Sequence, residues 1–162
     1  MGFETGSIRA GLEGFTGIPH RLEYIGRIRG ADWYNDSIAT APERSMAAIR
    51  SFTEPIVLLA GGRDKHLPWE EFARLVHERV EHLVLFGESA PLIAQAVGPA
   101  RHGQKPYSIT MCANLQQAVE TAAGVAKNGD VVLLSPGGTS FDEFKDFEER
   151  GERFVQWVKA LS

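Results

Sequence analysis

The chain has 162 residues, of which 43% are hydrophobic and 23% are charged. These values are typical of one folded domain and exclude a disordered or fibrous protein. The formal net charge of −4 at pH 7 excludes the basic field expected of a nucleic-acid-binding protein. No apolar run is long enough to span a bilayer, and the single cysteine, Cys112, cannot form an internal disulfide. We therefore expect a cytoplasmic protein without nucleic-acid or membrane partners and without a structural metal.

Short β-rich runs alternate with helical patterns along the whole chain. The first predicted elements are two strands, residues 22–28 and 31–34, which are separated by a glycine-containing turn. A helix follows over residues 42–51, because a proline begins it and apolar residues recur at helical spacing. Ala47 is predicted to lie on its buried side.

The next two strand–helix pairs follow the same rhythm. Residues 55–60, PIVLLA, form a continuous apolar run, which is typical of a strand buried on both faces of a parallel sheet. Residues 68–80 carry apolar side chains at the spacing of an amphipathic helix. A strand over residues 82–86 then precedes a helix over residues 90–97, for which Ser89 is the predicted N-cap.

Two further pairs complete the predicted elements. A strand over residues 107–112 is followed by a helix over residues 115–127, with Asn114 as its N-cap. The last apolar strand covers residues 130–135, and after a glycine-rich turn a long helix runs from about residue 144 to 161.

This alternation predicts an α/β fold with a doubly wound, Rossmann-like and mostly parallel sheet, covered by helices on both faces. Residues 15–162 are expected to form this domain, and residues 1–14 an N-terminal tail or the remnant of a preceding domain. In such sheets ligands bind at the carboxyl ends of the strands, near the point where the strand order reverses. Three loops are expected at that edge: residues 35–40, 61–66 and 135–147.

The first loop places four small polar residues between a strand and a helix: Asn35, Asp36, Ser37 and Thr40. These residue types form Asx turns and helix caps, which is one interpretation. The other is that a carboxylate and hydroxyl groups hold a ligand at the helix N-terminus. The pattern alone leaves both open.

The second loop, GGRDKH, combines a glycine pair with three charged residues. The ammonium group of Lys65 suits a carboxylate or a phosphate at this edge, although a solvated turn would contain the same residues. The loop is not a P-loop, because it lacks the GxxxxGK[ST] pattern. No GxGxxG follows a strand either, so the sequence does not favour a conventional dinucleotide site.

The third loop contains hydroxyl groups just before the last helix, among them that of Ser140. Free N–H groups at a helix start can bind an anion, and Ser140-x-x-Glu143 also fits a capping box. No GxSxG motif or serine triad can be assembled from the sequence. Arg21 lies before the first strand. Its guanidinium group could bind a phosphate with two hydrogen bonds, or the residue could be an ordinary surface arginine.

Four segments, GIPHRLE, YNDSIAT, LLAGGRDK and LLSPGGTSFDEFKDFEERGERF, resemble the C-terminal domain of the Mur ligases and occur in the family's order. The FxxFEERG ending of the last segment most resembles the glutamate-adding members. The resemblance implies an ATP-dependent amide ligase that adds D-glutamate to UDP-N-acetylmuramoyl-L-alanine, through an acyl phosphate, in peptidoglycan precursor synthesis. Two further domains of such a ligase hold the UDP group, the P-loop and the magnesium ligands.

The resemblance also implies roles for individual residues. The positions expected to hold the glutamate carboxylates are Thr40, Lys65, Ser140 and the backbone at Phe147. The positions expected to contact ATP, at its phosphates and ribose, are Arg21 and Asp36. No catalytic or metal-binding residue is expected in this domain. ATP and Mg²⁺ would bind mainly to the absent central domain. The expected partners are the missing domains of the same ligase, glutamate and the UDP-muramoyl precursor. The domain alone is expected to be inactive.

One position departs from the family pattern. Where the family has NDSKATN this chain has NDSIATA, so Ile38 replaces a lysine and removes a positive charge from the amino-acid pocket. A variant ligase that adds L-glutamate or another amino acid is therefore an alternative. A stand-alone α/β nucleotide-binding module is a second alternative, although the missing GxGxxG motif speaks against it.

Overall fold

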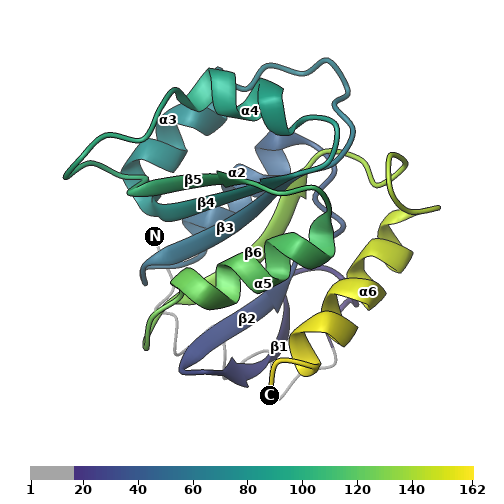
Figure 1. Cartoon of the computed structure of the whole chain (residues 1–162). Coiled ribbons are helices and arrows are strands. Elements are labelled where there is room, and N and C mark those ends of the chain that lie inside the picture. The colour runs from purple at the N-terminus through teal and green to yellow at the C-terminus, as the bar shows by residue number, and fades with distance from the viewer. Residues whose placement is uncertain (1–16) are drawn as a thin grey trace.

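The computed structural model describes residues 17–162, so the predicted tail, residues 1–14, lies outside the described residues. Its centre is a six-stranded sheet in the order β1-β2-β6-β3-β4-β5 (Figure 1). β1 pairs antiparallel with β2, and every other neighbouring pair is parallel. The strands are β1 (Glu23–Ile28), β2 (Ala31–Asn35), β3 (Ile56–Gly61), β4 (Val80–Phe86), β5 (Ser108–Met111) and β6 (Val131–Gly137).

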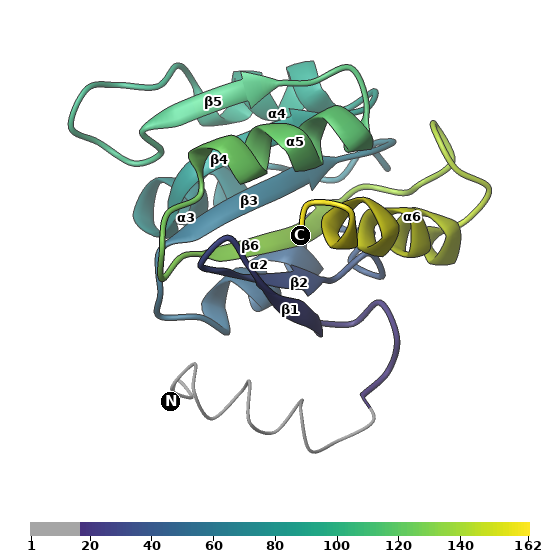
Figure 2. The same cartoon turned by 60° about the horizontal axis from the view of Figure 1, so that its bottom comes forward.

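Helices cover both faces of the sheet (Figures 1 and 2). On one face lie α2 (Pro42–Arg50), α3 (Glu70–Arg79) and α4 (Ala90–Val97), and on the other α5 (Leu115–Val125) and α6 (Phe147–Lys159). The predicted fold class, a doubly wound and mostly parallel α/β sheet, is confirmed. Among the helices between residues 17 and 162, none combines the length and apolar character needed to cross a bilayer.

The central strands are apolar along their whole length because both of their faces are buried. In β3, Leu58 packs into the core beneath α2, α3 and α4, while its neighbours Val57 and Leu59 pack into the core beneath α5 and α6. β6 alternates in the same way, with Leu133 on the first face and Leu134 on the second. Burial on both faces explains why these strands show no polar alternation in the sequence.

The position of β6 decides where the site lies. β6 follows β5 in the chain, yet it lies between β2 and β3 in the sheet. The path from β2 to β3 crosses one face through α2, and the path from β5 back to β6 crosses the other through α5. The carboxyl ends of β2, β6 and β3 are therefore adjacent at the point where the strand order reverses, which is where α/β sheets bind ligands.

Several predicted boundaries are wrong, each for a local reason. α3 begins at Glu70 and Val80 already belongs to β4, so the strand follows the helix directly. α6 begins at Phe147 rather than near residue 144, because the preceding residues form turns. In α2, Ala47 is exposed, and the buried side instead carries Ala48.

Ser89 occupies the N-cap position of α4, but its side chain accepts no hydrogen bond from the helix. Its backbone N–H donates to the carbonyl oxygen of Gly62 at 2.8 Å, which ties the start of α4 to the loop after β3. Its hydroxyl is buried and has no hydrogen-bond partner among residues 17–162. The prediction of a side-chain cap is therefore wrong at Ser89, whereas Asn114 does cap α5 by accepting from the N–H of Gln117.

Candidate functional site

The loops after β3 and β6 are joined by backbone hydrogen bonds at the carboxyl edge of the sheet. The N–H of Arg63 donates to the carbonyl oxygen of Thr139 at 2.8 Å, and the N–H of Thr139 donates back at 2.9 Å. Gly62 makes this approach possible, because its φ of +100° is unfavourable for other residues and a Cβ there would collide with the Thr139 carbonyl. The two loops therefore form one surface.

Lys65 and Thr40 come together on this surface. The Lys65 ammonium group donates a hydrogen bond to the Thr40 hydroxyl at 3.2 Å, although the two residues are on different loops. Lys65 is exposed and Thr40 is half-buried, so both remain accessible to a ligand. The structure thus places side by side two residues that the sequence nominated for one binding site.

Asp36, at the end of β2, is buried, with a relative exposure of 4%. Its carboxylate accepts hydrogen bonds from the Leu22 N–H at 3.1 Å and from the Ser135 hydroxyl at 2.8 Å. Burial raises the pKa of Asp36 to about 6, and these two hydrogen bonds together with the charges of Arg21 and Arg44 oppose that rise. A carboxylate with this pKa changes its charge close to neutral pH.

Asp36 and Arg21 line the same cavity, which has a volume of about 150 Å³. Ile38 and Arg44 also line it, together with small residues on one side of α2. The structure therefore brings together the two residues nominated for ATP contact. It also places Ile38, the position that departs from the family pattern, in this cavity.

Arg150, in α6, is a residue of the site that the sequence prediction missed. Its guanidinium is fully buried and donates to the Ser37 hydroxyl at 2.9 Å, to the Ser37 carbonyl at 2.7 Å and to the Gly138 carbonyl at 3.0 Å. The Ser37 hydroxyl in turn donates to the carbonyl oxygen of Phe147 at 2.8 Å. Arg150 thereby connects the loop after β2, the loop after β6 and the start of α6.

Burial lowers the pKa of Arg150 to about 10, and the nearby carboxylates of Asp142 and Glu143 oppose this shift. The guanidinium therefore remains charged at neutral pH. The signal that could have found it is its spacing, because Arg150, Phe154 and Val158 recur at i, i+4 and i+8 and form the buried stripe of α6. A charged residue in an otherwise apolar stripe indicates a buried charge with dedicated partners.

The segment before β1 is fixed against the first loop and α6. The Asn35 side-chain amide lies 3.0 Å from His20 Nδ1 and donates to Glu23 Oε1 at 3.0 Å. The His20 carbonyl accepts from the Ile38 N–H at 3.1 Å. Gly151 of α6 leaves the space that the His20 imidazole occupies. Arg21 follows His20 directly, so these contacts fix the backbone that carries it.

Ser140 and Phe147 flank the turns that lead into α6. Asp146 is the N-cap of that helix and accepts from the Glu149 N–H at 2.8 Å. The predicted Ser140–Glu143 capping box is therefore wrong. The Glu143 carboxylate instead accepts from the Leu115 N–H, with both oxygens at 3.3 Å. Ser140 is buried, and Phe147 is the first residue of α6, where N–H groups have no partner within the helix.

A parallel sheet with polar loops gathered at its switch point defines a ligand-binding α/β domain. Residues 20–138 match the family model described as Mur ligase, glutamate ligase domain. Because this match covers most of the chain, the protein belongs to that family.

Relatives with similar sequences are much longer than this chain. A UDP-N-acetylmuramoylalanine–D-glutamate ligase from Symbiobacterium thermophilum is 44% identical over 156 residues, which are 96% of this chain and 34% of the relative. One from Acetivibrio thermocellus is 43% identical over 150 residues, which are 91% of this chain and 32% of the relative. The chain thus spans about a third of the length of the curated relatives it matches.

Solved structures with lower sequence identity share the fold. The MurF ligase from Thermotoga maritima in complex with ADP has a TM-score of 0.59 at 16% identity, over 90% of this chain and 33% of that one. A bifunctional folylpolyglutamate synthase/dihydrofolate synthase from Yersinia pestis has a TM-score of 0.59 at 18% identity, over 97% of this chain and 34% of that one. These two likenesses concern the arrangement of the strands and helices.

Proposed function

We propose that this chain is the C-terminal domain of an ATP-dependent ligase that adds D-glutamate to UDP-N-acetylmuramoyl-L-alanine. The observation that carries the proposal is the hydrogen-bonded pair of Lys65 and Thr40 at the carboxyl edge of the sheet. Relatives above 40% identity are named as this ligase, and they extend well beyond the region that this chain matches.

In this proposal four groups of the chain hold the incoming amino acid. The Lys65 ammonium and the Thr40 hydroxyl bind one glutamate carboxylate. The Ser140 hydroxyl and the N–H at Phe147 bind the other. The chemistry fits a dicarboxylate, because an ammonium group and the free N–H groups of a helix N-terminus both donate hydrogen bonds to a carboxylate and complement its negative charge. The role of these groups is to orient the amino group for its attack on an activated carboxyl group.

Arg21 and Asp36 are proposed to contact ATP, the first at its phosphates and the second at its ribose. Their shared cavity and the opposite charges of the two side chains support this assignment. ATP supplies the phosphoryl group that activates the alanyl carboxylate. Within residues 17–162 no group of three or more His, Cys, Asp or Glu side chains is arranged to hold a metal ion. Independently of that finding, the family resemblance leads us to propose that Mg²⁺ binds mainly to the domain expected to precede this one, in an enzyme that works in the cytoplasm.

A second candidate within the same family is a variant ligase that adds L-glutamate or another amino acid. Its motivation is the sequence departure at Ile38, where the family pattern has a lysine. Ile38 lines the cavity of Arg21 and Asp36, which is the cavity proposed for ATP, so its position does not favour this variant over D-glutamate. A domain of this family that stands alone and binds a nucleotide such as NAD is the remaining alternative.

The test is Lys65→Ala in the intact enzyme. Losing a hydrogen bond to a charged group costs roughly 1.5–3 kcal/mol, so the KM for D-glutamate should rise about 10- to 100-fold. Lys159→Ala is the matched control, because Lys159 is an exposed lysine at the end of α6, and its KM should not change. An unchanged KM in Lys65→Ala would remove Lys65 from the amino-acid site.

A second experiment separates the candidates. The ¹⁵N-labelled chain is titrated with D-glutamate, L-glutamate, ATP and NAD, and amide shifts are followed by NMR. Shifts at Lys65, Ser140 and Phe147 with D-glutamate support the proposal, whereas a preference for L-glutamate supports the variant ligase. Shifts with NAD and with neither glutamate would support the nucleotide-binding module and contradict the proposed site.

A further inference from the structure

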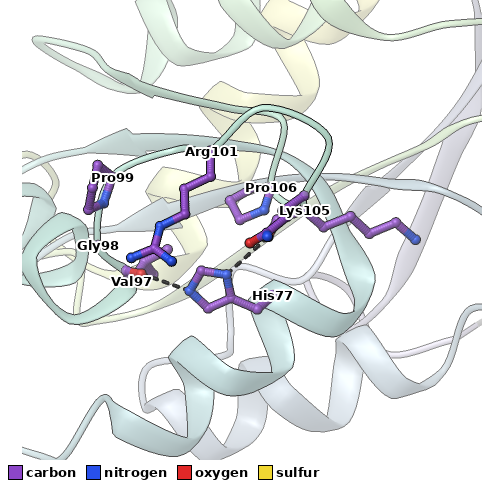
Figure 3. A pocket seen from close by; sticks show the side chains of 8 residues that line it. His77, Val97, Gly98, Pro99, Arg101, Lys105 and Pro106 are labelled. Atoms are coloured by element: carbon purple, nitrogen blue, oxygen red, sulfur yellow. Dashed lines mark hydrogen bonds between the residues drawn. The ribbon is translucent and has the colours of Figure 1, made fainter.

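A larger cavity, shown in Figure 3, has a volume of about 510 Å³. Its lining residues place it at the edge of the sheet opposite to the candidate site. It opens between the C-terminal ends of α3 and α4 and the loop of residues 98–106 that leads to β5. Its volume lies within the range of roughly 300–1,000 Å³ that is usual for small-molecule sites. The lining residues are His77, Val97, Gly98, Pro99, Arg101, Gln104, Lys105 and Pro106.

The cavity is preformed, because His77 holds the loop at both of its ends. His77 Nε2 lies 2.7 Å from the carbonyl oxygen of Val97, and its Nδ1 lies 3.0 Å from that of Lys105 (Figure 3). These two contacts tie both ends of the loop to α3, so His77 fixes the loop.

The charge of the lining residues is opposite in sign to that of the whole chain. None of the lining residues is acidic, and the loop of residues 98–106 contains Arg101, His102 and Lys105 but no Asp or Glu. The chain as a whole has a formal net charge of −4. Such a local excess of positive charge attracts an anion.

Arg101 is the group best placed to bind that anion. Its side chain is exposed, and within residues 17–162 its guanidinium forms no hydrogen bond or salt bridge. In Figure 3 it reaches from the loop towards Val97 and His77, whereas the ammonium group of Lys105 points away from it. The guanidinium donors are therefore available for a planar, bidentate interaction, which matches phosphate geometry.

We propose that this cavity binds a phosphate ester of nucleoside size, with Arg101 as the phosphate ligand. The volume exceeds what a single inorganic anion fills, and Val97, Pro99 and Pro106 provide apolar surface for the remainder of the molecule. Because the cavity lies at the edge opposite to Lys65 and Thr40, this proposal is independent of the proposed ligase function.

The experiment titrates the ¹⁵N-labelled 162-residue chain with AMP, adenosine and inorganic phosphate as separate probes. AMP should shift the amides of residues 98–106, with a Kd on the order of 1 mM or lower. Arg101→Gln should weaken AMP binding at least about tenfold, because it removes a charged bidentate donor. Arg101→Lys should bind AMP with intermediate affinity, since lysine keeps the positive charge but cannot form the planar, bidentate interaction of a guanidinium. Lys127→Gln is the matched control, because it removes an exposed positive charge from another connection, and it should change nothing.

Each contrary result overturns the proposal in a recognisable way. Adenosine binding as tightly as AMP would show that the phosphate is not recognised. Inorganic phosphate binding as tightly as AMP would show that the site takes only an anion. Equal weakening by Lys127→Gln would indicate general electrostatics, and absence of shifts at residues 98–106 would exclude the site. AMP bound near Asp36 shifts a different set of amides, so the two cavities are distinguished in the same spectra.

Discussion

Replacing Asp36 by asparagine should make the stability of this domain less dependent on pH. The asparagine side chain can keep both hydrogen bonds of the carboxylate, because its oxygen accepts from the Leu22 N–H and its amide donates to the Ser135 oxygen. The substitution therefore removes the buried charge and leaves the packing in place.

The size and sign of the effect follow from the pKa. Burial raises the pKa of Asp36 from 3.8 to about 6, so the folded protein holds this proton more tightly than the unfolded chain. The contribution of Asp36 to stability is then largest below the unfolded value and is lost as pH rises through about 6. At 1.36 kcal/mol per pKa unit, a rise of about two units costs the wild type about 3 kcal/mol above pH 7.

The assay is urea unfolding of the wild type and Asp36→Asn between about pH 4 and pH 8. The difference in free energy of unfolding should grow by about 2.5 kcal/mol in favour of the variant across that range, because pH 4 already lies just above the unfolded pKa of 3.8. Ser135→Ala, which removes a hydrogen bond that stabilises the charged form, should move the transition to higher pH. A difference between wild type and Asp36→Asn that does not change with pH would refute the reasoning.

Three further substitutions test the framework of the site by thermal or urea unfolding. Arg150→Met should destabilise the domain by about 3 kcal/mol or more, because buried carbonyl groups lose their donors. Arg150→Lys should restore only part of this stability. A loss below about 1 kcal/mol in Arg150→Met would contradict the structural role given to the Arg150 hydrogen bonds. Gly62→Ala should cost several kcal/mol through its positive φ and the collision with Thr139, whereas an exposed glycine with open space around it, such as Gly124, should tolerate alanine. Asp146→Ala should lower the free energy of unfolding by about 1 kcal/mol, because it removes the N-cap of α6. An unchanged stability would show that the cap does not contribute to it.

The sequence was sufficient for the fold class and for the edge at which the site lies. Runs such as residues 56–60 are apolar because they are buried on both faces, and that property is visible without a structure. The carboxyl ends of parallel strands share one edge, so the loops containing Asp36, Thr40 and Lys65 could be assigned to it. The order of the strands in the sheet could not be predicted, because the hydrophobic pattern of a strand does not indicate which other strands pair with it.

Two details of the site were not predictable for more specific reasons. Ser140-x-x-Glu143 and Asp146-x-x-Glu149 both fit a capping pattern, and Asp146 is the cap because it directly precedes the amphipathic stripe of α6. Arg150 has its acceptors in two loops, one of which precedes it by more than a hundred residues in the chain. Hydrogen bonds between residues so far apart in the chain depend on the tertiary structure. The one signal in the sequence was that a charged residue, Arg150, occupies a position in the buried apolar stripe of α6.

The central position of β6 has a consequence for how the chain folds. Until residues 131–137 are in place, the β1–β2 hairpin and the β3–β4–β5 unit share no backbone hydrogen bonds within a sheet, because β6 is the strand that joins them. Long-range pairings of this kind form late, since the entropy of closing a long loop must be overcome first. Folding of the sheet and assembly of the loops of the candidate site are therefore expected to be a single late event, in which β6 joins the two parts of the sheet and brings Ser135 into hydrogen-bonding distance of Asp36.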